Sequence, residues 1–280
     1  MTSMALALER EAHHERDLPA LRDRKVRYAI YYEILSRHWV LTTDHRERLA
    51  RLQQSPRRVL KGDRVVEGGQ GTRNLYAVQQ GWACSKRVSR NGHGQILDLY
   101  LPGDIIGLRD YHGGGLDEVV MLTEGLLVAM PKSQLKQMTR RHSELSEALL
   151  AAALHQGNII ADRLNNLLSH DATTRLAHLL LELHARAHGS DPDSSELVLP
   201  VSQQVIGDLL GMTNVHVCRC MTYLEARNML RRQPATRTIH LLDRTALSEL
   251  SGFAMSYVYA DLSRRQRATR EAGQRSPVMA

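Results

Sequence analysis

Apolar and polar residues alternate in short runs through the first half of the chain. Between about residues 56 and 135, each apolar run is separated from the next by one or more turn residues, mostly glycine. The runs lie at 58–60, 64–66, 75–78, 96–101, 119–122 and 126–130. Strands at such short spacing, with turn residues between them, predict a compact antiparallel β-roll or sandwich. We place this first domain at residues 36–142, after an N-terminal extension of residues 1–35.

Glycine becomes rare between residues 143 and 169, and a seven-residue apolar pattern takes its place. Steps of three and four residues connect Leu150, Ala153, Gly157, Ile160, Leu164 and Leu167. A stripe this narrow, with small residues in it, suits close packing of two identical helices. The alternative is that the stripe packs against the roll of its own chain. We predict a dimerisation helix over residues 143–169.

Two short helices joined by a glycine turn are predicted in the last third, after an amphipathic helix at about residues 172–187 and a loop at 189–195. The amphipathic helix carries Leu176, Leu179, Leu180 and Leu183 on one face. Ser202 is suited to cap the first short helix, Gly211 permits the turn, and Thr213 caps the second. The first buries Ile206, Leu209 and Leu210. This order of signals predicts a helix-turn-helix.

The second short helix has two distinct faces. Val217, Cys220, Met221 and Leu224 fall on one side, and Val215, Cys218, Arg219 and Thr222 fall on the other. Residues 230–242 then predict two strands around a basic turn, which together form a wing. A generic pair of helices in a bundle is the alternative, but two caps, a glycine and a basic wing in this order favour a winged helix-turn-helix. The fold class is therefore α+β, with the winged domain at residues 170–250 and a basic, flexible tail at 251–280.

Composition and charge narrow the function. The chain has 280 residues, 42% of them hydrophobic, and a formal net charge of +7. Arginines crowd its last fifth, namely Arg231, Arg232, Arg237, Arg264, Arg265, Arg267 and Arg270. This bias suits a polyanionic partner such as double-stranded DNA, although a solvated basic surface is the alternative. No apolar stretch approaches the roughly 18 residues of a membrane span, and the start lacks a secretion signal. We expect a cytoplasmic protein without membrane contact.

The winged segment resembles the Crp/Fnr family of transcription regulators, and the resemblance covers about residues 36–250. It implies a second helix in the major groove, with base contacts from Asn214, Val215, Cys218 and Arg219. It implies phosphate contacts from Ser202, Gln203, Gln204, Thr213 and His216, and the basic wing adds Arg231, Arg232 and Arg237. The cyclic-AMP and anaerobic regulators carry an arginine or serine and a glutamate at the positions of Asn214 and Val215. The operator is therefore expected to differ from theirs, because Val215 offers only apolar contact.

The sensor half departs further from the family pattern. Cyclic-nucleotide binders of the family carry Gly-Glu for the ribose and, about ten residues later, Arg-Ser for the phosphate. Here Gly107 is followed by Leu108, and the later stretch holds Asp117 and Glu118. Carboxylates near a phosphate that requires a cation are unfavourable, so we expect no cyclic AMP binding.

Redox and metal cofactors find little support in the sequence. An iron–sulfur cluster needs four thiolates, whereas Cys84 is the one cysteine of the sensor half. His38, His93 or His112 as a haem ligand is the alternative, but histidines in polar turns are usually solvated. We expect no cofactor and no metal. Cys218 is a possible redox site, because a helix N-terminus and Arg219 favour a thiolate there. A small side chain tolerated against the groove is the simpler interpretation.

The resulting prediction is a homodimeric, sequence-specific DNA-binding regulator of transcription that acts on a palindromic operator, with an effector still to be identified. Contact with RNA polymerase is expected if it is an activator. The alternative is a partner-binding β-roll whose DNA-binding domain is vestigial. An enzyme is not expected, because the chain contains no nucleophile elbow, P-loop, dinucleotide fingerprint or metal-binding helix motif.

Overall fold

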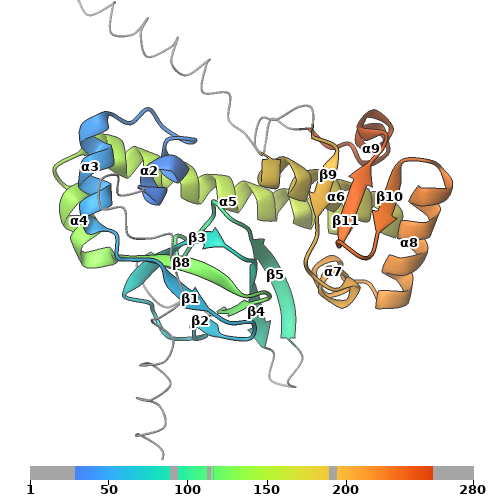
Figure 1. The fold of residues 1–280 in the computed structure, drawn as a ribbon, viewed down its shortest axis with the longest axis horizontal. Helices are drawn as coiled ribbons and strands as arrows, with labels where there is room; N and C mark the ends of the chain where they lie inside the picture. The colour runs from blue at the N-terminus through green and yellow to red at the C-terminus, as the bar shows by residue number, and fades with distance from the viewer. Residues whose placement is uncertain (1–28, 89–93, 112–114, 116, 189–193, 255–280) are drawn as a thin grey trace, which may run out of the picture.

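The first domain of the computed structural model is an antiparallel β-roll (Figure 1). The structure describes residues 29–88, 94–111, 115, 117–188 and 194–254. One sheet has the order β1-β8-β3-β6 and the other β2-β7-β4-β5, and every pairing is antiparallel. The strands are β1 (Arg57–Val59), β2 (Arg64–Val66), β3 (Asn74–Gln80), β4 (Ala83–Val88), β5 (Gly94–Tyr100), β6 (Ile105–Ile106), β7 (Glu118–Met121) and β8 (Gly125–Pro131). The predicted roll is confirmed.

Three short helices close the end of the roll: α2 (Ile30–Leu35), α3 (Thr43–Leu52) and α4 (Lys132–Thr139). Tyr31 of α2 is completely buried, and its hydroxyl lies 2.9 Å from the carbonyl oxygens of both Leu75 and Val128 and accepts the N–H of Ala77 at 3.1 Å. Residues 29–35, which the sequence left in an N-terminal extension, are therefore anchored in the roll. Residues 1–28 of that extension and 255–280 of the predicted tail lie outside the described residues.

The long helix α5 (Ser143–Ser169) runs past the roll towards the C-terminal domain (Figure 1). Its inward face consists of Leu145, Ala148, Ala152, Gln156, Ile159, Arg163 and Asn166. The predicted heptad seam lies on another face: Leu150, Gly157 and Leu164 are exposed, and the other three seam residues are half-buried. Ala153 packs against the buried cluster of the roll, so part of the stripe contacts its own domain, whereas Leu150, Gly157 and Leu164 face outwards.

The C-terminal domain contains the predicted helices and wing. It consists of α6 (Ala172–His188), β9 (Glu196–Val198), α7 (Gln203–Leu210), α8 (Asn214–Ala226), β10 (Leu230–Gln233), β11 (Thr238–Leu241) and α9 (Arg244–Ser251). The strands form one sheet in the order β10-β11-β9. All four leucines assigned to the buried face of α6 are buried. In the described ranges, no helix combines the length and apolar composition needed to cross a bilayer.

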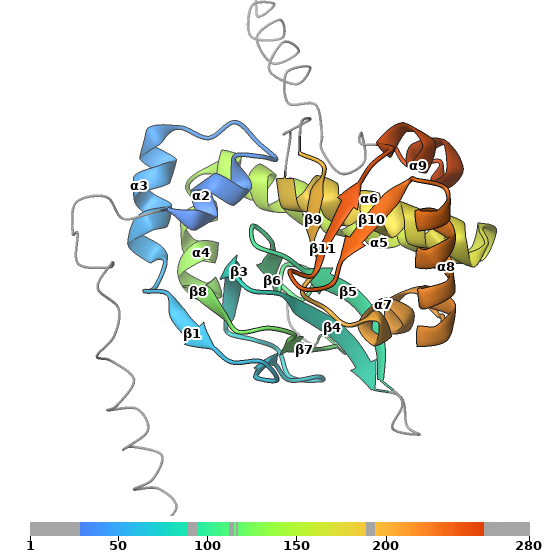
Figure 2. The same ribbon diagram turned by 45° about the vertical axis from the view of Figure 1, so that its right-hand side comes forward.

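The two domains share a hydrophobic core, and α7 lies beside β5 (Figure 2). Trp82, Ile96 and Leu101 of the roll belong to the same buried cluster as the apolar residues of α6, α7 and α8. In addition, α7 lies against β5, where the Gln95 side chain donates a hydrogen bond to the Asp208 carbonyl. The C-terminal domain is thus docked on the roll, and docking is favoured by removal of apolar surface from water.

Candidate DNA interface

The turn between α7 and α8 is built by two capped helices and two glycines. The Ser202 hydroxyl accepts the N–H of Val205, and the Thr213 hydroxyl accepts the N–H of His216. Gly211 ends α7 with a φ of +64°, a conformation that suits glycine. The caps and this glycine were predicted from the sequence, and the structure confirms them.

Gly207 is a second requirement of the turn that sequence reasoning missed. A Cβ placed on Gly207 would lie 2.5 Å from the carbonyl oxygen of Met212, closer than side chains approach backbone. The two helices can therefore cross closely only because residue 207 has no side chain. A glycine in the interior of a helix, where it is unfavourable, is the signal that pointed to such a close approach.

The outward face of α8 is accessible. Asn214, Val215, Cys218, Arg219 and Thr222 are all exposed, and with Gln203 they line an open hollow. The opposite face is buried in the domain and comprises Val217, Cys220, Met221 and Leu224. This division agrees with the two faces predicted from helical periodicity. A helix whose first turns present polar, cationic and small apolar groups has the shape and chemistry to contact base edges in a major groove.

The start of α7 flanks this face. Ser202 and Gln204 are exposed, and Gln203 is half-buried. The Gln204 side-chain amide donates to the Asp208 carboxylate at 2.6 Å, so its side chain lies along its own helix. Ser202 and Thr213 use their hydroxyl oxygens as caps, and the free N–H groups of each helix start make it a favourable place for phosphate oxygens. His216 is exposed one turn into α8.

The three wing arginines occupy different environments. The Arg232 guanidinium forms an ion pair with Glu225 and donates to the Thr222 hydroxyl at 3.2 Å, and the Arg232 backbone N–H donates to Glu225 at 2.9 Å. Arg232 therefore ties the wing to α8. The hydrogen bond from Arg232 holds the pKa of the Glu225 carboxyl below its usual range, so the pair is charged at neutral pH.

Arg237 and Arg231 are exposed, but they lie in different parts of the wing. Arg237 has a φ of +55° in the turn between β10 and β11, and its guanidinium donates to the Pro200 carbonyl at 3.2 Å. Arg231 lies opposite His240 in the β10–β11 ladder, and its side chain is on the face of the sheet opposite to that of Arg232. Of the three, Arg237 is at the tip of the wing.

The three cysteines are separated as expected. Cys218 is exposed on the outward face of α8. Cys220 is buried, with its sulfur 3.6 Å from the Thr173 hydroxyl. Burial raises the pKa of the Cys84 thiol to about 11, so this residue is protonated at neutral pH. A thiolate chemistry at Cys84 is thereby disfavoured.

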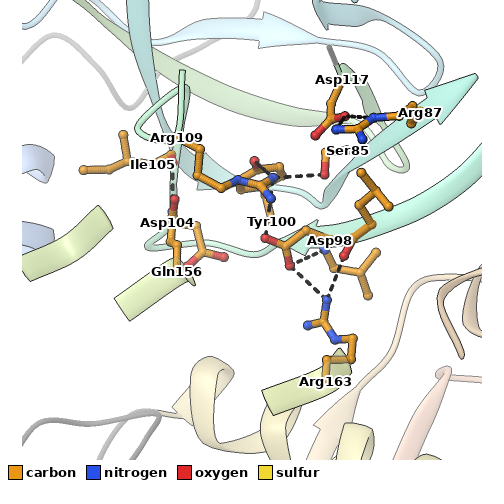
Figure 3. Close-up of polar contacts among 12 residues, drawn as sticks. Ser85, Arg87, Asp98, Tyr100, Asp104, Ile105, Arg109, Asp117, Gln156 and Arg163 are labelled. Carbon is orange, nitrogen blue, oxygen red and sulfur yellow. Dashed lines mark hydrogen bonds and ion pairs between the residues drawn. The ribbon is translucent and has the colours of Figure 1, made fainter. Parts of the chain in front are cut away.

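The interior of the roll contains a cation that the sequence analysis did not single out. The Arg109 guanidinium donates to the Tyr100 hydroxyl at 2.8 Å and to the Ser85 hydroxyl at 3.1 Å, and lies 3.9 Å from the Asp98 carboxylate (Figure 3). Burial raises the pKa of Tyr100 to about 12, so its hydroxyl stays protonated. Arg109 was missed because it follows Leu108 in a turn and none of its partners is near it in the sequence.

The two carboxylates predicted to oppose a nucleotide are each paired within the roll. Asp117 lies 2.8 Å from Arg87, and Glu118 lies 2.9 Å from Lys86 and 3.6 Å from Arg64. Leu108 is buried as an apolar side chain. Of the possible haem ligands, His38 packs against His155 with a ring separation of 4.8 Å, whereas His93 and His112 lie outside the described residues.

Two family models match the chain, one in each domain. The model described as a cyclic nucleotide-binding domain matches residues 56–142, and the model described as a Crp-like helix-turn-helix domain matches residues 174–250. The chain is 30% identical over 192 residues to the nitrogen fixation regulation protein FixK of Azorhizobium caulinodans, covering 68% of this chain and 76% of the relative. It is 22% identical over 218 residues to the transcriptional activator protein Anr of Pseudomonas protegens, covering 76% and 86%.

Solved structures show the same architecture. FixK2 from Bradyrhizobium japonicum superposes with a TM-score of 0.65 at 24% identity, covering 71% of this chain and 98% of that chain. A CRP-family transcriptional regulator from Thermus thermophilus superposes with a TM-score of 0.56 at 20% identity, covering 71% and 97%. The relatives are transcription regulators, not enzymes, as the sequence motifs indicated.

Proposed function

Because the chain belongs to the Crp/Fnr family of transcription regulators, we propose that it acts as a homodimer that binds a palindromic operator through α8. The observation that carries this proposal is the exposed outer face of α8, held by the capped turn and flanked by the wing. On this face Arg219 can fork onto a guanine edge, and Val215 can contact a thymine methyl. Arg237 at the wing tip and the starts of α7 and α8 lie where phosphates would approach.

The exposed stripe on α5 supports the dimer. Leu150 and Leu164 are each 55% exposed although they are large and apolar, and Leu168 is 79% exposed one turn beyond Leu164. A Cβ on Gly157 would meet nothing within 4 Å, so this position is open for the approach of another helix. A second copy of the same helix, placed along this seam, would remove these side chains from water and set two α8 helices at a fixed separation.

We propose that cyclic AMP is not the effector. Leu108 offers no group for a ribose hydroxyl, and in the stretch where a phosphate would need a free cation Arg87 and Lys86 are already paired with Asp117 and Glu118. The three groups around Arg109 already occupy its guanidinium within the roll.

A chain that binds chromosomal DNA is expected to work in the cytoplasm and, if it activates transcription, to contact RNA polymerase.

Selection of operators from random duplex DNA, followed by sedimentation of the free protein and the complex, tests the proposal. We expect a palindromic sequence with half-sites about one helical turn apart and two chains per duplex. Ile160→Asp combined with Leu164→Asp should leave a folded monomer with weak operator binding. A folded double variant that is still dimeric at low micromolar concentration and still tight on the palindrome would contradict the dimer. Titration calorimetry with cyclic AMP should show no micromolar binding.

A further inference from the structure

A cluster of six charged residues, five of them buried or half-buried, lies where the roll, α5 and the C-terminal domain meet. We call it the junction network. It consists of Asp98, Asp104, Arg109, Arg163, Glu182 and Arg186. The roll contributes two carboxylates and one guanidinium, α5 contributes one guanidinium, and α6 contributes one of each, so the three acids are matched by three arginines drawn from all three parts.

Arg163 is the centre of the network. Its guanidinium donates to the Asp98 carboxylate and the Leu97 carbonyl of the roll, both at 3.2 Å, and to the Glu182 carboxylate of α6 at 2.6 Å. Arg163 is 4% exposed and Glu182 is 1% exposed. A helix that carries the proposed dimer seam on one face thus contacts both domains from its other face, and Figure 3 shows its Arg163 reaching Asp98 of the roll.

A second set of contacts bypasses α5 and joins α6 directly to the roll. Arg186 donates to Glu182 at 2.8 Å, to the Asp104 carboxylate at 2.7 Å and to the Leu99 carbonyl at 2.6 Å. Burial alone would raise the pKa of Glu182, but the guanidinium groups of Arg163 and Arg186 hold it below its usual range. Every acid of the network therefore has a cation within reach, as buried charges require.

We infer that Glu182 and Arg163 are positioning residues for DNA binding, which fix the angle of the C-terminal domain against the roll and α5. The shared apolar core supplies docking energy, but apolar contact has no preferred direction and tolerates sliding. Guanidinium–carboxylate pairs have defined geometry and are unfavourable when broken in a buried place. The junction network therefore selects one orientation and, through it, one separation of the two α8 helices in the dimer.

The test is the dependence of binding on half-site spacing, and it rests on the proposed function. Arg163→Met with Glu182→Met removes the central pair as a whole, so that Asp98 keeps Arg109 at 3.9 Å and Arg186 keeps Asp104 at 2.7 Å, and Glu182→Gln removes one charge conservatively. Glu249→Gln is the matched control, because Glu249 is an exposed acid of the same domain. Wild-type protein and control should prefer one spacing over spacings changed by two base pairs by at least ~10-fold, since only one geometry allows both half-sites to bind.

In the double variant this preference should fall below about 3-fold while affinity for a single half-site stays within about 2-fold of wild type. Amide exchange in α7, which packs on β5, should be faster in the DNA-free double variant than in DNA-free wild-type protein. Glu182→Gln should give values between those of wild type and the double variant, both for spacing preference and for amide exchange. If the double variant does not fold, the spacing preference and the α7 amide exchange of Glu182→Gln test the inference. Unchanged spacing preference and unchanged α7 protection in the folded variants would overturn the inference. If wild-type protein bound no DNA, the proposed function would fail. The inference about the orientation of the C-terminal domain would then be tested by the amide exchange of α7 alone.

Discussion

The arginines of the junction network and those of the DNA face differ in burial, in partners and in proposed role. Arg163 and Arg186 are less than one-tenth exposed, and each is held by two carboxylates. Arg219 and Arg231 are exposed, and the guanidinium of neither has a hydrogen bond or ion pair to another described residue. The first pair is held by carboxylates within the fold, whereas the second pair is available to a polyanion.

This comparison shows that net charge alone does not locate a DNA-binding surface. Each arginine contributes equally to the formal charge of +7, although only the exposed ones can displace counterions from phosphates. The partners of Arg163 are 65 residues before it and 19 residues after it in the chain. No local pattern therefore distinguishes a buried arginine on α5 from an exposed one on α8.

The largest expected effect is on stability, from Arg163→Ala. This change leaves Asp98 and Glu182 buried with one cation fewer, and breaking a buried pair in this way costs about 3–5 kcal/mol. Urea unfolding followed by the fluorescence of Trp82, which lies in the shared core, measures the loss. Arg163→Met with Glu182→Met should cost less, because Glu182 is removed together with its cation and only Asp98, which keeps Arg109 at 3.9 Å, loses a partner. Equal losses in the two variants would show that packing, and not the charge, is responsible.

The next effect is on base preference, from Arg219→Ala. Loss of one bidentate base contact should cost about 1–3 kcal/mol on the selected operator and remove discrimination at one position of each half-site. Arg227→Ala is the control, since Arg227 directly follows the same helix but its guanidinium stacks on Tyr223 at 4.5 Å. Binding curves on operator and scrambled DNA decide the point. An equal loss of binding free energy on both DNAs, with base preference retained, would mean that Arg219 contacts a phosphate and not a base.

A smaller effect is expected from Arg232→Ala. The sequence predicts a phosphate contact for Arg232, whereas the structure pairs its guanidinium with Glu225, and partly exposed pairs contribute about 0.2–1 kcal/mol. We expect a stability loss of this size and little change in the salt dependence of DNA binding. A double-mutant cycle with Glu225→Gln measures the coupling. If the salt slope falls by one unit and the coupling is absent, Arg232 contacts DNA after all.

The smallest expected effect is a difference in the salt dependence of DNA binding between variants of the two exposed wing arginines, Arg237 and Arg231. Arg237→Ala should lower the slope of log affinity against log salt by about one unit on all duplexes, because one phosphate contact is lost. Arg231 lies on the outer face of the wing sheet, and its replacement by alanine should change the slope less. Titrations at several salt concentrations compare the two. Equal slopes for both variants would mean that the outer face also approaches the DNA.

Much of the fold and of the DNA face follows from local rules that a sequence displays directly. Ser202, Thr213 and Gly211 fix the ends of α7 and α8 through caps and a left-handed turn, which depend on residues at most a few positions apart. The periodicity of α8 places Cys218 outside and Cys220 inside because a helix turns by a constant angle per residue. Strand spacing likewise indicates the roll.

Tertiary structure decided what depends on partners far apart in the chain. It assigned α2 to the roll through Tyr31, separated Arg232 from Arg237 in the wing, and placed Arg109 inside the roll. It also brought Arg163 between Asp98 and Glu182. Burial and pairing of a charge are properties of the surroundings that several elements create together. A sequence read one element at a time states the residue type, but only the packed structure states whether that charge faces water, a carboxylate or a nucleic acid.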